Sequence, residues 1–162
     1  MNELTSEQIN SFMQEALIEA KKAGSKGEVP IGAVLVDENN QIIARSHNLR
    51  EQEYKTTSHA EINVIEIANN FKKNWRLEKT RLFVTVEPCL MCSGAILQAR
   101  IPELYYGIKD SKFGAVDSLY NTLRDDRLNH QLQVYSGILE YESKKLMQDF
   151  FSHLRSKREK QL

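Results

Sequence analysis

Cys89 and Cys92 are the residues of this sequence with the clearest capacity for chemistry. They are the only two cysteines among the 162 residues, and two positions separate them. Two cysteines are too few for a disulfide framework, so a pair at this spacing indicates metal binding or redox chemistry. If the pair begins a helix, both sulfurs lie on one face, and the positive end of the helix dipole favours the thiolate form that metals bind.

His59 is the clearest candidate for a third ligand of such a metal. Two thiolates and one imidazole suit a tetrahedral zinc ion. A structural zinc site needs a fourth ligand, but the sequence has no third cysteine and no second histidine near His59 at a zinc-finger spacing. The remaining position would be free for water, whose pKa zinc lowers to about 7. We therefore expect one Zn2+ per subunit, although ligand type alone does not name the metal uniquely.

Glu61 lies two positions after His59 and is the candidate proton carrier. A water activated by zinc needs a neighbouring carboxylate to move its protons. Three other interpretations of these residues remain open. Ser58 and Glu61 also match a helix capping box, in which Glu61 would only satisfy backbone donors. A redox pair would leave His59 and Glu61 without a joint role, and a non-catalytic, zinc-stabilised binding module would make Glu61 dispensable.

The spacing of apolar residues predicts the elements that must position these side chains. In chain order they are a helix over 6–23, strands over 31–36 and 41–44 joined by a turn at 37–40, a helix from residue 58 or 59, a strand over 82–86, a helix over 88–99, a strand over 103–107, a helical piece over 117–123, a strand over 132–135 and a C-terminal helix at about 141–160. Ser6 is the predicted N-cap of the first helix, and Pro88 suits the first position of the third.

This order of elements predicts an α/β sandwich. Helices alternate with buried strands after an initial hairpin, which is typical of a mixed sheet with helices on both faces. We find no linker and no internal repeat, so residues 1–162 are expected to form a single domain. In such a fold, ligands gather at strand ends and helix starts, where both candidate motifs are predicted to lie.

Charge and hydropathy exclude several classes of protein. Lys and Arg number 22, and Asp and Glu also number 22, so the chain is not a globally basic nucleic-acid binder. The C-terminal helix has a local surplus of positive charge. No apolar stretch approaches the roughly 20 residues that cross a bilayer, and the polar, acidic start does not resemble a secretory signal. We therefore expect a cytoplasmic protein.

The two motifs together resemble those of a known family. Residues 59–61 read His-Ala-Glu and residues 88–92 read Pro-Cys-Leu-Met-Cys, which is the paired signature of zinc nucleobase deaminases in the cytidine-deaminase superfamily. The sequence is most similar to bacterial tRNA-specific adenosine deaminases. The likeness extends over nearly the whole chain, through residues 28–36, Asn48, and residues 84–89, 110–115, 128–130 and 148–151.

The resemblance implies a role for each residue that matches the family's motifs. The implied zinc ligands are His59, Cys89 and Cys92, and the implied proton shuttle is Glu61. The implied substrate-binding residues are Asn48, which would hydrogen-bond the base, Val29 and Pro30, which would wall the pocket, and Ala60 and Leu90, whose backbone would supply hydrogen bonds. The resemblance also implies a three-layer α/β/α sandwich with a five-stranded mixed sheet, and a homodimer.

The implied reaction is the hydrolytic deamination of adenosine to inosine at the wobble position of tRNA anticodons. The anticodon arm would contact the basic helix through Arg155, Lys157 and Arg158, although a solvated charged face is the ordinary explanation of such residues. The alternative function is deamination of a free nucleobase, nucleoside or nucleotide: cytosine, cytidine, deoxycytidylate or guanine. Three departures from the family pattern bear on the substrate, namely Lys55-Thr56, Asp117 and Ser143.

Overall fold

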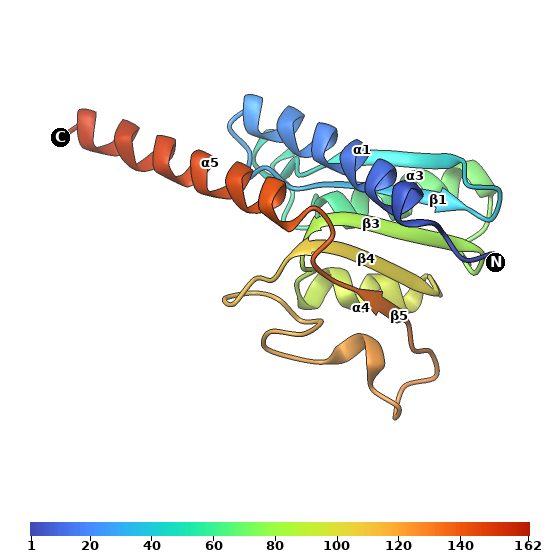
Figure 1. Cartoon of the computed structure of the whole chain (residues 1–162). Coiled ribbons are helices and arrows are strands. Elements are labelled where there is room, and N and C mark those ends of the chain that lie inside the picture. Colours follow the sequence, from blue (N-terminus) through green and yellow to red (C-terminus); the bar gives the residue numbers. More distant parts are fainter.

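A five-stranded mixed sheet forms the centre of the computed structural model, which describes residues 1–162 (Figure 1). The strands are β1 (Gly32–Asp37), β2 (Ile42–His47), β3 (Thr80–Val86), β4 (Glu103–Ile108) and β5 (Gln133–Tyr135). Their order across the sheet is β2-β1-β3-β4-β5. Strand β1 is antiparallel to β2 and to β3, whereas β3, β4 and β5 are mutually parallel.

Helices cover both faces of this sheet, which confirms the predicted three-layer α/β/α sandwich. Helices α1 (Ser6–Ser25) and α5 (Glu140–Lys160) lie on one face, and α3 (Ala60–Lys72) and α4 (Leu90–Gln98) lie on the other. The loops contain a short helix α2 (Arg50–Glu53) and a 3-10 turn at Thr122–Arg124. None of these helices has both the length and the apolar character needed to cross a lipid bilayer.

The side chains of the central strands point alternately to the two faces of the sheet, and each face has its own hydrophobic core. Leu82 and Val84 of β3 pack into the core beneath α3 and α4, whereas Phe83 packs into the core beneath α1. Every residue of β3 is buried, as its nearly continuous apolar run predicts for a strand covered on both sides. Both helical layers therefore pack against β3, whose side chains belong to both cores.

The strand register brings all the predicted site segments to one end of the sheet. Gly32 pairs with His47, Ala33 with Val84, and Val86 with Ile108. The start of β1 therefore lies beside the carboxyl ends of β2, β3 and β4. Helices α3 and α4 begin at this same end, because α3 follows the loop after β2 and α4 follows β3.

Three local features differ from the sequence-based expectation. The N-cap of α1 is Thr5 and not Ser6, because Thr5 and Gln8 form a reciprocal capping box one residue earlier. The predicted helical piece over 117–123 is reduced to residues 122–124, and the N–H groups of Leu119 and Thr122 donate to Gly114 and Ala115, which are too distant in sequence for an α-helix. Helix α2 was not predicted, since four polar residues carry no periodic signal.

Gly32 is the point at which α1 packs most closely on the sheet. A Cβ atom at this position would clash with the carbonyl oxygen of Ala16 and the amide nitrogen of Ala20. Because both are helix backbone atoms, they can give way only if α1 moves from the sheet. We expect Gly32→Ala to lower the free energy of unfolding by about 1–3 kcal/mol in urea denaturation.

Gly94 is the matched control for this substitution. It lies in α4, and nothing would lie within 4 Å of a Cβ atom there. Gly94→Ala should leave stability unchanged or raise it by up to about 1 kcal/mol, because alanine is the better helix former. Equal losses of stability in the two variants would contradict the packing argument.

Candidate active site

Three potential metal ligands gather at this end of the sheet. The donor atoms of His59, Cys89 and Cys92 all lie within 4.8 Å of one another. The Nδ1 atom of His59 is 3.5 Å from the Cys92 Sγ and 3.7 Å from the Cys89 Sγ. Zinc bonds of about 2.3 Å to sulfur and 2.0 Å to nitrogen, at a tetrahedral angle, separate the two kinds of ligand atom by about 3.5 Å. The spacing and the chemistry of the three donors therefore fit zinc.

Helix starts position all three donors. His59 is the N-cap of α3 and Cys89 is the N-cap of α4, while Cys92 lies buried in the first turn of α4. The expectation that Pro88 is the first helical residue was wrong, because α4 begins at Leu90 and Pro88 precedes the N-cap. The cysteines nevertheless share the first turn, so both sulfurs face the imidazole of His59.

The two thiols differ in their electrostatics. Hydrogen bonds with Cys92 and with His59 lower the pKa of Cys89 to about 4. The same hydrogen bond to Cys89, together with burial, raises the pKa of Cys92. The thiolate form is therefore favoured on Cys89 and disfavoured on Cys92. A bound zinc ion would release the proton of Cys92, since metals bind the thiolate form.

Glu61 lies beside this cluster without being part of it. Its side chain is 4% exposed, and burial is the main cause that raises its pKa. Its carboxyl group is close enough to the Cys92 thiol to perturb the pKa of that thiol. A buried carboxyl with a raised pKa next to a metal cluster is typical of a general acid or base.

The capping-box interpretation of Glu61 was wrong. The hydroxyl of Ser58 donates to the Glu53 Oε2 at 2.8 Å and to the Asn63 Oδ1 at 3.2 Å. The N-cap of α3 is His59, and no side chain accepts a capping hydrogen bond there. Ser58 and Glu61 therefore do not form a capping box at the start of α3.

Backbone donors of both helices point toward the same end of the sheet. The first helical hydrogen bonds are those from Asn63 N to His59 O and from Ser93 N to Cys89 O. The N–H groups of the preceding residues, among them Ala60 and Leu90, therefore have no acceptor within their helices. Ala60 is buried, whereas Leu90 is 55% exposed.

Asn48 and the segment before β1 form the neighbouring wall. Asn48 follows β2 and is buried. Its Nδ2 donates to the carbonyl oxygen of Val29 at 3.4 Å, and its Oδ1 accepts the N–H of Arg50 at 3.1 Å. Val29 is half-buried and Pro30 is buried. The structure thus brings together Asn48, Val29 and Pro30; their contact with a base stays a prediction.

Sequence reasoning missed Glu87, which holds the loop over residues 110–118 in place beside Cys89. Its buried carboxylate accepts the N–H groups of Asp110, Val116, Asp117 and Ser118, at 2.8–3.1 Å, as well as the hydroxyl of Ser118. Burial raises the pKa of Glu87, but these hydrogen bonds outweigh it and hold the pKa below its ordinary value. The only sequence signal was an acidic residue at the end of an apolar strand.

Glu28 was missed in the same way. Its carboxylate is fully buried and accepts the N–H of Glu51 at 2.7 Å. It therefore fastens the loop that leads from Asn48 to His59. Glu28 and Glu87 are the two buried carboxylates that anchor the loops on either side of the metal ligands.

The three departures from the family pattern have different surroundings. Lys55 and Thr56 lie in the exposed part of the loop before His59. Asp117 accepts a hydrogen bond from the Tyr106 hydroxyl and forms an ion pair with Arg124 at 2.6 Å. Ser143 is buried, and its hydroxyl has no hydrogen-bond partner. None of them touches a metal ligand in the contacts described.

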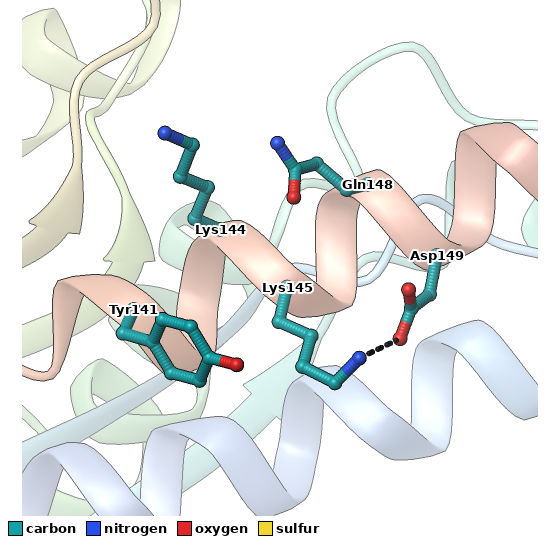
Figure 2. A pocket seen from close by; sticks show the side chains of 5 residues that line it. All are labelled: Tyr141, Lys144, Lys145, Gln148 and Asp149. Atoms are coloured by element: carbon teal, nitrogen blue, oxygen red, sulfur yellow. Dashed lines mark ion pairs between the residues drawn. The ribbon is translucent and has the colours of Figure 1, made fainter.

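The predicted RNA-contacting residues lie apart from the metal cluster. Arg155, Lys157 and Arg158 are exposed on the second half of α5, which projects beyond the sandwich (Figure 1). The first half of α5 lines a hollow of about 270 Å³ (Figure 2). Its lining includes an ion pair of 3.2 Å between Lys145 and Asp149 but none of the three gathered donors. This hollow is therefore not the active site.

Comparison with known proteins assigns the chain to a class and then to a family. Residues 7–155 match the model of the MafB19-like deaminases, so the fold and the site define a deaminase. The chain is 52% identical to the tRNA-specific adenosine deaminase of Streptococcus pyogenes serotype M1 over 147 residues, which cover 91% of this chain and 85% of that protein. Identity to the enzyme of the same name from Bacillus subtilis strain 168 is 50%, covering 91% of each chain. The chain belongs to the family of tRNA-specific adenosine deaminases.

A solved structure agrees with this assignment. It comes from a study of A-to-I editing by tRNA:A34 deaminases at the wobble position of transfer RNA. Its sequence is 46% identical, and the superposition has a TM-score of 0.81 and covers 84% of this chain and 98% of that one. The shared fold therefore extends to almost the whole of the solved chain.

Proposed function

We propose that this chain converts adenosine to inosine at the wobble position of tRNA anticodons, with water as the second substrate and ammonia as the second product. One observation carries the proposal: the His59, Cys89 and Cys92 donors lie next to the buried carboxyl of Glu61 in a chain so similar to tRNA-specific adenosine deaminases. The same geometry supports no role for a redox pair, since a disulfide would leave the imidazole and the carboxyl unused.

The proposed mechanism gives each residue of the cluster a separate task. His59, Cys89 and Cys92 would hold the zinc ion, which when bound supplies a Lewis acid that makes water acidic enough to lose a proton near neutral pH. Glu61 accepts a proton from the attacking water and donates it to ring nitrogen N1. It then takes the second proton of that water, from the hydroxyl group now on C6, and passes it to the amino group, which leaves as ammonia as the C6 carbonyl forms.

The surrounding residues would bind and orient the base. Asn48 would hydrogen-bond adenine, and Val29 and Pro30 would form an apolar wall. The free N–H groups of Ala60 and Leu90 lie at helix starts, where the positive end of the dipole favours developing negative charge. An unpaired base of an anticodon loop costs the least to extrude into such a pocket, so loop RNA suits the site better than a duplex.

We also propose the setting in which the enzyme works. Residues 1–162 would act as one zinc-dependent deaminase domain. The chain would act as a homodimer, and the exposed apolar side chains of Leu119, Tyr120 and Leu128 are candidates for its interface. A tRNA substrate and two free thiols fit the reducing cytoplasm. Sedimentation of the zinc-loaded protein would test the dimer.

The experiment that tests the function compares RNA with free substrates. Zinc-loaded protein is incubated with an anticodon stem-loop that carries adenosine at the wobble position, and separately with adenosine, cytidine, deoxycytidylate, cytosine and guanine. Digestion and chromatography then measure each product. We expect inosine in the stem-loop and no product from the free compounds. Turnover of a free compound with none of the RNA would overturn the choice of substrate.

The basic end of α5 carries a further prediction. If Lys157 and Arg158 each neutralise one phosphate, replacing both by glutamine should lower the slope of log affinity against log salt concentration by about 1.4 to 1.8. Fluorescence anisotropy of a labelled stem-loop, measured over a salt series, gives this slope.

The control pair is Lys73 and Lys79, which are exposed beyond the far end of α3. Replacing these two lysines by glutamine removes the same formal charge. It should leave the slope close to that of the wild type. Equal slopes for all three proteins would mean that the C-terminal charges are simply solvated.

A further inference from the structure

Two exposed aromatic residues lie in the loops that hold the metal ligands. Tyr54 is 95% exposed and Phe113 is 69% exposed. A lysine adjoins each of them in sequence, so the two loops carry the pairs Tyr54-Lys55 and Lys112-Phe113, and both lysines are exposed. Side chains with so little buried surface contribute little to folding, and an exposed aromatic next to a cation is suited to binding nucleic acid.

The loop of Phe113 is attached directly to the ligand Cys89. The residue after Phe113, Gly114, forms an isolated β-bridge with Cys89. The N–H of Ala115 donates to the carbonyl oxygen of Pro88 at 2.9 Å. The carboxylate of Glu87 anchors the same loop from inside the protein. Phe113 therefore has a fixed backbone position beside the ligand, although its side chain is open to solvent.

The loop of Tyr54 is attached in the same way to His59. The N–H of Leu49 donates to the carbonyl oxygen of Ser58 at 3.0 Å, which closes the loop immediately before the ligand. Tyr54 ends α2 with a φ of 54°, a left-handed conformation that is rare for an aromatic residue. The buried carboxylate of Glu28 anchors this loop at Glu51. The tyrosine is thus held outward by a constrained backbone.

We propose that Tyr54 and Phe113 are stacking surfaces for the two nucleotides that flank the deaminated base, and that they favour loop RNA over free nucleosides. The proposal rests on the proposed function. When one base is extruded into the pocket, its neighbours lose their stacking partner, and an aromatic side chain on each side replaces it. Lys55 and Lys112 are placed to meet the phosphates of these same nucleotides.

Phe71 provides a matched control for this assignment. It is 68% exposed, almost the same as Phe113, but it lies near the end of α3. At 1.5 Å per residue, that position is roughly 16 Å along the helix from the residue that follows His59. A general effect of exposed phenylalanine would appear at both positions, whereas a stacking surface at the site requires only Phe113.

Kinetics on the zinc-loaded enzyme test the proposal. With the wobble-adenosine stem-loop as substrate, Tyr54→Ala and Phe113→Ala should each raise KM about tenfold, as expected for the loss of one stacked base, with kcat nearly unchanged. Phe113→Trp and Tyr54→Phe should keep the wild-type KM, whereas Phe113→Leu should not. Phe71→Ala should match the wild type. An unchanged KM in both alanine variants, or a leucine variant equal to the tryptophan variant, would overturn the proposal.

A binding measurement provides a readout independent of turnover. A product stem-loop with inosine at the wobble position carries 2-aminopurine at either the 5′ or the 3′ flank. We expect its fluorescence to be quenched on binding, and each alanine variant to relieve quenching at one flank only. If the wild type leaves the wobble adenosine unmodified, the proposed function fails and this proposal fails with it. If the wild type converts the wobble adenosine and both alanine variants have the KM and quenching of the wild type, the stacking proposal alone fails.

Discussion

Replacing Glu61 by glutamine should lower the rate of deamination by about 10²- to 10⁴-fold, while the protein keeps its zinc. Glutamine has nearly the same shape, but it cannot accept and return a proton. Glu61 is not one of the three gathered donors, so the metal does not depend on it. Inosine formation in the stem-loop gives the rate, and elemental analysis of the same sample gives the metal content.

Glu66 provides the control on the same helix. It is exposed on α3, and Glu66→Gln makes the same chemical change away from the cluster. This variant should retain the wild-type rate and metal content. If Glu61→Gln kept its turnover, the proton shuttle would have to be another group. If it lost its zinc, the carboxyl would belong among the ligands.

Replacing Cys92 by alanine should weaken zinc binding by more than about 100-fold and reduce deamination to background. Loss of a residue that merely supports a ligand typically weakens metal affinity by about 10- to 100-fold, so loss of a ligand should cost more. Cys92 is fully buried, and no other cysteine can replace it. Competition with a coloured chelator measures the affinity.

Ser93 and the wild-type protein supply the controls for this substitution. The Ser93 hydroxyl is buried without a hydrogen-bond partner in the same turn of α4, so Ser93→Ala should keep both zinc and activity. Chelator treatment of the wild type should abolish activity, and added zinc should restore it. Full activity of Cys92→Ala, or of the chelated wild type, would contradict a metal-dependent reaction.

The sequence was sufficient to predict the architecture, because its apolar periodicity is strong. The buried run at Leu82–Val86 and the alternation after the first hairpin predict a mixed sheet with helices on both faces, and the family resemblance added the five strands and three layers. The ligand cluster was also predictable, because few residue types bind zinc and this chain has only two cysteines. Local boundaries were less certain: Thr5 and Ser6 are both good capping residues, and the choice between them depends on the partner Gln8.

Interactions between distant segments were beyond the reach of sequence patterns. The carboxylate of Glu87 accepts hydrogen bonds from N–H groups about thirty positions later in the sequence, and no periodicity encodes such a contact. In the same manner, the backbone N–H of Glu51 donates to the carboxylate of Glu28. The sequence therefore indicated the three donors that the structure gathers, but not the buried carboxylates that anchor the loops around them.

Glu28 and Glu87 anchor both loops from inside the protein, whereas the proposed stacking residues lie on the outer parts of the same loops. The outer residues of these loops, 52–57 and 111–113, contribute no donor to the metal cluster. On the proposed stacking role, we expect exchange of these short outer segments between relatives to alter which RNA is accepted and to leave the reaction itself intact. Substrate preference in this fold can therefore diversify in small, interchangeable pieces while the inner chemistry is inherited unchanged.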